Sequence, residues 1–91
     1  MNDEELKSFK TMMRGIFSNL PSSKVLVIHA DKNYAISMNP NKVGFIWSEG
    51  NGDNKRLFDD LKVTYFGFTF MAYDKEIMSI DYGDIESYEV V

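Results

Sequence analysis

The stretch that decides the fold is residues 63–73, which read VTYFGFTFMAY. Bulky apolar side chains alternate in it with small or polar ones, a pattern typical of a half-buried β-strand. Three phenylalanines, Phe66, Phe68 and Phe70, occupy one side of this predicted strand. We expect them in the middle of the core, because each removes a large apolar area from water. Gly67 predicts a bulge, a bend or the close approach of another backbone.

The N-terminal residues 3–18 predict an amphipathic helix. Its apolar positions recur at spacings of three and four: Leu6, Phe9, Met13, Ile16, Phe17 and Leu20. Asn2 is placed to cap the helix, with Glu5 three residues later as in a capping box. We expect the apolar side of this helix to pack on the phenylalanines of residues 63–73.

The remaining chain alternates apolar runs with turn residues. Strands are expected at 24–30, 34–38, 43–48, 77–81 and 86–91, a short helix at 55–61 and a glycine-rich loop at 49–54. The strand at 24–30 is apolar on both sides, which favours a central position covered on both faces. The predicted fold is therefore α+β, with the helix packed on a curved antiparallel sheet of five or six strands arranged as two three-stranded meanders.

Length and composition favour one small globular domain spanning residues 1–91, since the chain has 91 residues of which 44% are hydrophobic. The net charge of −4 disfavours direct binding to nucleic acid or to an anionic membrane. The chain has no cysteine, which excludes disulfides and thiolate zinc sites and is compatible with the cytoplasm. The acidic, polar N-terminus gives no secretory signal, and no apolar run is long enough to span a membrane.

Catalytic and metal-binding signatures are missing. His29 is the single histidine and lies in an apolar strand, so a structural role is favoured over that of a catalytic base. The loop at 49–54 matches neither an EF-hand nor a phosphate-binding loop. The sequence thus predicts no enzyme activity, no metal and no cofactor.

The C-terminal part is strongly acidic: from Asp74 onward it holds six carboxylates and one lysine. One interpretation is the solvated side of a strand pair, which also discourages edge-to-edge aggregation. The other is an acidic, tyrosine-bearing surface that docks on a basic partner, since tyrosines are enriched at binding hot spots. The candidate partner-binding residues are Tyr65, Asp81, Tyr82, Asp84, Glu86, Tyr88 and Glu89.

These features favour a small, non-catalytic cytoplasmic protein-binding module. The class expected for a compact acidic domain of this kind is an inhibitor of a host or partner protein, such as a phage anti-CRISPR protein, an antitoxin or an immunity protein, acting by surface occlusion. The partner is expected to carry a basic surface. A homodimer formed through a sheet edge is a further expectation.

Two short resemblances keep an alternative open. Tyr82, Asp84 and Ile85 form a corner that resembles the closing turn of bacterial pleckstrin-like domains. The fragment Phe66-Gly67-Phe68 resembles the core of the aromatic motif of RNA-recognition-motif domains. The alternative that we keep is a ligand-, peptide- or RNA-binding small β-barrel of pleckstrin-like or Sm-like type.

Overall fold

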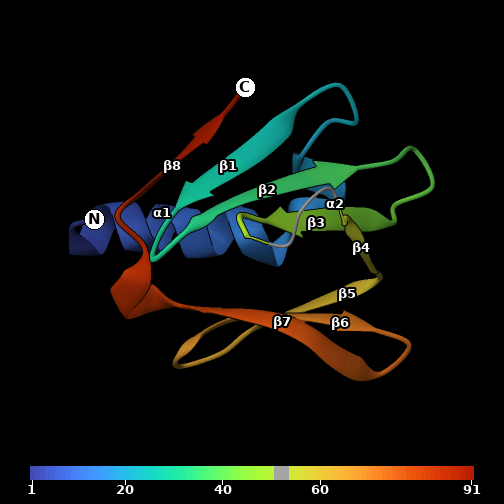
Figure 1. Ribbon diagram of the computed structural model, residues 1–91. Helices are drawn as coiled ribbons and strands as arrows, with labels where there is room; N and C mark the ends of the chain where they lie inside the picture. Colours follow the sequence, from blue (N-terminus) through green and yellow to red (C-terminus); the bar gives the residue numbers. More distant parts are fainter. Residues whose placement is uncertain (51–53) are drawn as a thin grey trace.

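The computed structural model describes residues 1–50 and 54–91 and shows one main helix with two antiparallel sheets (Figure 1). The elements are α1 (Asp3–Arg14), α2 (Ile16–Asn19), β1 (Val25–His29), β2 (Asn33–Met38), β3 (Gly44–Ser48), β4 (Arg56–Phe58), β5 (Asp60–Val63), β6 (Gly67–Ala72), β7 (Lys75–Asp81), the 3-10 helix η1 (Tyr82–Asp84) and β8 (Ser87–Val90). The α+β class is confirmed. The glycine-rich loop predicted at 49–54 falls partly outside the described residues.

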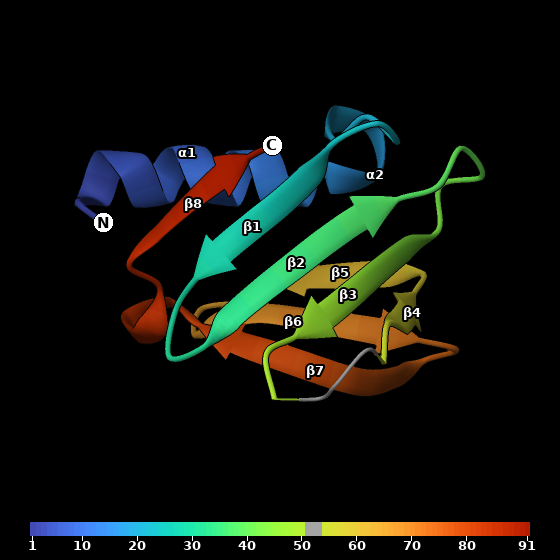
Figure 2. The same ribbon diagram turned by 45° about the horizontal axis from the view of Figure 1, so that its top comes forward.

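The two sheets lie face to face around the core (Figure 2). The larger sheet has the strand order β4-β3-β2-β1-β8 and the smaller one the order β5-β6-β7. The chain crosses between them at Asp59, which separates β4 from β5, and returns through η1. The sheets do not close into a barrel, so the barrel form of the alternative is wrong.

The strand count and one pairing differ from the prediction. The described residues form eight strands, and β8 pairs with β1 in the larger sheet, where Glu89 lies opposite Val27. The second meander therefore consists of β5, β6 and β7. The acidic strand β8 is an edge strand of the larger sheet, not a neighbour of β7.

Helix α1 lies along one side of the molecule (Figure 1). On this side, β8 is the edge strand of the larger sheet and β5 is the edge strand of the smaller sheet. Its start agrees with the predicted cap, because the Asn2 side chain accepts a hydrogen bond from the Glu5 backbone N–H at 2.8 Å. The Phe9 ring stacks on Tyr88 of β8 at 4.2 Å and meets Phe68 of β6 edge-on at 5.2 Å. One helical side chain thus joins both sheets, as expected for a residue on the apolar face of the helix.

The short helix expected at 55–61 is wrong, since this segment forms β4 and β5. Phe58 pairs across the strands with Gly44, and a side chain at Gly44 would overlap the Phe58 ring. The fully buried Phe58 ring therefore occupies the space above a glycine from β3. This long-range packing overrides the local helical spacing of the segment.

Phe66 is not a core residue, and this prediction is also wrong. Strand β6 begins at Gly67, so Phe66 lies in the preceding turn with 75% of its surface exposed. Phe68 and Phe70 are fully buried as expected. The predicted close approach at Gly67 is confirmed, because a Cβ there would overlap the backbone carbonyl oxygen of Ile80.

Candidate functional site

The seven residues predicted to bind a partner are distributed over three parts of the structure. Tyr65, Asp81, Asp84 and Glu86 are exposed at the end of the molecule where the β5–β6 turn meets η1. Tyr82 and Tyr88 are half-buried against the core. Glu89 lies on the outer face of the larger sheet.

The most exposed aromatic residues of the first group are neighbours in the β5–β6 turn. Tyr65 is 89% exposed and Phe66 is 75% exposed, and their rings meet edge-on at 5.3 Å. We call this pair the aromatic tip. Exposed large aromatics at the end of a hairpin contribute little to the core of their own domain, so they are candidates for contact with another molecule.

The backbone of the aromatic tip is held by Thr64. The Thr64 hydroxyl oxygen accepts hydrogen bonds from the backbone N–H groups of Phe66, at 3.2 Å, and Gly67, at 3.1 Å. The same hydroxyl donates to the Gly67 carbonyl at 3.0 Å. The tip therefore has a defined conformation and does not need to be ordered on binding.

Tyr82 fixes the tip to the rest of the domain. Its backbone N–H donates to the Phe66 carbonyl at 3.0 Å, and its hydroxyl donates to the Thr64 carbonyl at 2.6 Å. The Tyr82 ring lies between Phe68, at 5.1 Å, and the Lys10 ammonium, at 4.2 Å. Burial raises the pKa of the Tyr82 hydroxyl, so it remains a donor. Tyr82 thus holds the backbone of the tip through two hydrogen bonds.

Three carboxylates gather near the same end of the molecule around the buried Tyr34. The Tyr34 hydroxyl donates to Asp31 Oδ1 at 3.2 Å. Burial raises the pKa of Tyr34 to about 12, and the negative charges of Asp31, Asp84 and Asp81 add to the rise. Asp81 is also the cross-strand partner of Gly67, next to the aromatic tip. Asp31 was missing from the prediction, because it is far from Asp81 in the sequence and only the fold brings them together.

The other predicted residues have different surroundings. Tyr88 stacks on Phe9 and belongs to the packing of α1. Glu89 Oε1 lies 3.3 Å from His29 Nε2, and His29 Nδ1 lies 2.9 Å from Asn33 Oδ1. The pKa of His29 is raised, mainly by the hydrogen bond with Asn33 and to a smaller extent by that with Glu89. His29 therefore links three strands at the surface, β1, β2 and β8.

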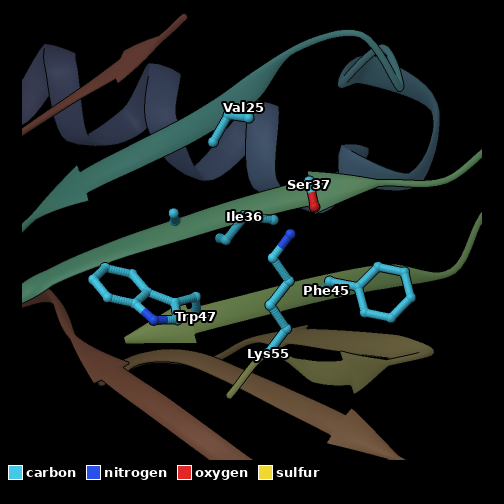
Figure 3. A pocket seen from close by; sticks show the side chains of 7 residues that line it. Val25, Ile36, Ser37, Phe45, Trp47 and Lys55 are labelled. Carbon is cyan, nitrogen blue, oxygen red and sulfur yellow. The ribbon is translucent and has the colours of Figure 1, made fainter. Parts of the chain in front are cut away.

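A second candidate site lies on the outer face of the larger sheet. A hollow of about 400 Å³, which we call the sheet hollow, is lined by Val25, Ala35, Ile36, Ser37, Phe45, Trp47 and Lys55 (Figure 3). The prediction that the strand at 24–30 is covered on both faces is wrong, because Val25 and Val27 are only half-buried. Phe45 and Trp47 alternate with buried residues along β3, and this alternation was the signal that large apolar side chains lie on the outer face of the sheet.

None of the helices in the described residues is long and apolar enough to cross a membrane. Residues 1–50 and 54–91 likewise contain no group of three or more acidic, histidine or cysteine side chains placed to hold a metal ion. Comparisons with protein-family models, with curated proteins and with solved structures found no match for this chain.

Proposed function

We propose that the protein is a non-catalytic protein-binding module that inhibits a partner by covering part of its surface with the aromatic tip. The observation that carries this proposal is the exposure of Tyr65 and Phe66, at 89% and 75%, on a turn that is itself firmly held. Tyrosine and other aromatic side chains supply much of the binding energy at protein interfaces when they enter a pocket of the partner. A tip that is ordered before binding loses little conformational entropy in the complex.

The carboxylates near the tip indicate the kind of partner. Asp31, Asp81 and Asp84 lie near the same end of the molecule, and the whole chain carries a net charge of −4. A basic surface on the partner would complement these carboxylates and accelerate the encounter. Proteins that bind nucleic acids present such surfaces, and the carboxylates would take the places of phosphates. An anti-CRISPR, antitoxin or immunity role in the cytoplasm is consistent with this chemistry.

The test compares aromatic residues at the two ends of the same β-strand. The double variant Tyr65→Ser/Phe66→Ser removes the tip, whereas Tyr73→Ser removes a 79% exposed tyrosine after the other end of β6. Each immobilised protein is used to capture the partner from a lysate of the native host. The proposal expects stoichiometric capture by the wild type and by Tyr73→Ser, and a loss of at least about a hundredfold in affinity for the double variant.

A second variant tests the role of the carboxylates. Asp81→Lys/Asp84→Lys reverses two exposed charges, so we expect slower association and a weaker dependence of the association rate on salt. Surface plasmon resonance with the captured partner measures both quantities. Equal binding by the tip variant and the wild type would refute the proposal, provided that circular dichroism shows both to be folded.

A further inference from the structure

The sheet hollow has the shape of a trough along β2. Its floor is formed by the small residues Ala35 and Ser37, and the cross-strand partners of these residues on β3 are Trp47 and Phe45. On the other side, Ser37 is paired with Val25 of β1. Small side chains in the middle strand between larger side chains on its neighbours thus create the depression that Figure 3 shows.

The outer face of the larger sheet is more apolar than that of the smaller sheet. The corresponding outer face of the smaller sheet presents mainly polar side chains, Asp60, Lys62, Thr69 and Ser79, with Met71 opposite Asp60, as expected for a sheet face in contact with water. A sheet face that instead carries the half-buried side chains of Val25, Phe45 and Trp47 is typical of a binding surface. The volume of about 400 Å³ lies within the range of small-molecule sites.

One cation lies over this apolar trough. Lys55 lines the hollow from the segment before β4, and its ammonium group extends across the sheet toward Ser37 (Figure 3). No carboxylate of residues 1–50 or 54–91 forms an ion pair with Lys55. Glu89, on the same face, is instead engaged by His29. Among the described residues that line it, the hollow therefore combines mainly apolar side chains with the Ser37 hydroxyl and the positive charge of Lys55.

From this combination we propose that the sheet hollow binds a small amphipathic anion, that is, an apolar chain or ring carrying one carboxylate. The apolar part would cover Ala35, Phe45 and Trp47, and the carboxylate would accept hydrogen bonds from the Lys55 ammonium. The Ser37 hydroxyl on the floor supplies one more donor. This site is separate from the aromatic tip, and the inference does not depend on the proposed function.

Trp47 provides the readout, because it is the single tryptophan of the chain and lines the hollow. Its fluorescence is followed during titration with decanoate and, in parallel, with decanol, both below the concentrations at which they aggregate. We expect a saturable change with decanoate and affinity for decanol that is about tenfold weaker, since hydrogen bonds to a charged group are the stronger ones.

Three variants locate the site. Lys55→Gln should reduce the affinity for decanoate to that for decanol, and Ala35→Leu should abolish the binding of both by filling the floor. The control Lys62→Gln removes a lysine from the outer face of the smaller sheet and should change neither affinity. Because Lys55 is an exposed side chain, its replacement leaves the fold intact even if Ala35→Leu does not fold.

Several outcomes would overturn the inference. Equal affinity of the wild type for decanoate and decanol, or a preference for decanoate that survives Lys55→Gln, would remove the role of the lysine. If the Trp47 fluorescence shows no saturable change with either compound, the hollow is not a binding site for such molecules. Concentration-dependent dimerisation that protects Trp47 from a soluble quencher, measured by ultracentrifugation and fluorescence, would assign the hollow to a second copy of the chain.

Discussion

Replacing Gly67 by alanine should strongly destabilise the protein, because the backbone of β7 lies too close to this position to admit a Cβ. A Cβ at this position would overlap the Ile80 carbonyl oxygen and would lie 2.9 Å from the Ile80 carbonyl carbon and 3.0 Å from Asp81 Cα. Favourable contacts between carbon atoms lie at about 3.5–4.0 Å. The overlap with the carbonyl oxygen requires the backbone of β7 to move away by about 1 Å or more, a shift that no side-chain rotation can avoid.

The size of the effect follows from these contacts. Overpacking a well-packed site costs about 1–3 kcal/mol, and weakening one strand hydrogen bond adds about 1 kcal/mol. The lower entropy of the unfolded alanine chain offsets about 0.5–1 kcal/mol of this cost. We expect Gly67→Ala to lower the free energy of unfolding by about 2–3 kcal/mol. For a domain of this size, that loss corresponds to a fall in Tm of roughly 10–20 °C.

Gly83→Ala is the matched control, because a Cβ at Gly83 meets no atom within 4 Å. We expect this variant to change stability by no more than about 0.5 kcal/mol. Urea unfolding followed by circular dichroism measures both variants against the wild type. If Gly67→Ala loses less than about 0.5 kcal/mol relative to Gly83→Ala, the account of the β6–β7 contact is incorrect.

Three further predictions concern other parts of the molecule. Tyr73 and Asp74 form a two-residue hairpin turn with φ values of 52° and 65°. Because Asn-Gly is preferred where both turn residues have positive φ, replacing the pair with Asn-Gly should stabilise the protein by about 1 kcal/mol, measured as a higher urea midpoint. Because the pKa of Tyr34 is raised from 10.0 to about 12, the folded state retains a proton that the unfolded state releases in this range. Stability should consequently fall as the pH rises from about 10 to 12, and urea unfolding of Tyr34→Phe should show a shallower fall in this window. The pKa of His29 should exceed its ordinary value of 6.5, mainly because of the hydrogen bond with Asn33 and secondly because of that with Glu89. The stability that protonated His29 contributes is therefore present below pH 6.5 and is lost as the pH rises through the raised pKa. NMR titration of this imidazole should show a lower pKa in Glu89→Gln, and an unchanged pKa would contradict the contact.

The elements determined by local signals were predicted well. The helix start follows from Asn2 and Glu5, whose capping contact involves residues three positions apart. The meander of the first three strands follows from apolar runs separated by turn residues. The close approach at Gly67 was also foreseeable, because a glycine inside a strand commonly marks a place where another backbone comes near.

The elements that depend on distant contacts were not predictable from the sequence. The segment 55–61 has helical spacing, and its pairing with β3, where Phe58 lies opposite Gly44, and with β6 makes it extended. Phe66 shares the alternation of Phe68 and Phe70, but the Thr64 turn places it outside the strand, which begins one residue later. The pairing of β8 with β1 likewise separates Glu89 from the other carboxylates of the predicted site.

The most direct test of the proposed function places a photo-crosslinking amino acid, benzoyl-phenylalanine, at position 66 in the native host. The matched control carries it at Thr69, on the outer face of the smaller sheet. If the aromatic tip is the binding surface, position 66 should crosslink to one host protein. Excess wild-type protein should suppress this crosslinked product, whereas an excess of the Tyr65→Ser/Phe66→Ser double variant should not suppress it. Crosslinking to the same protein with equal yield from position 69, or no protein product from position 66, would contradict the proposal.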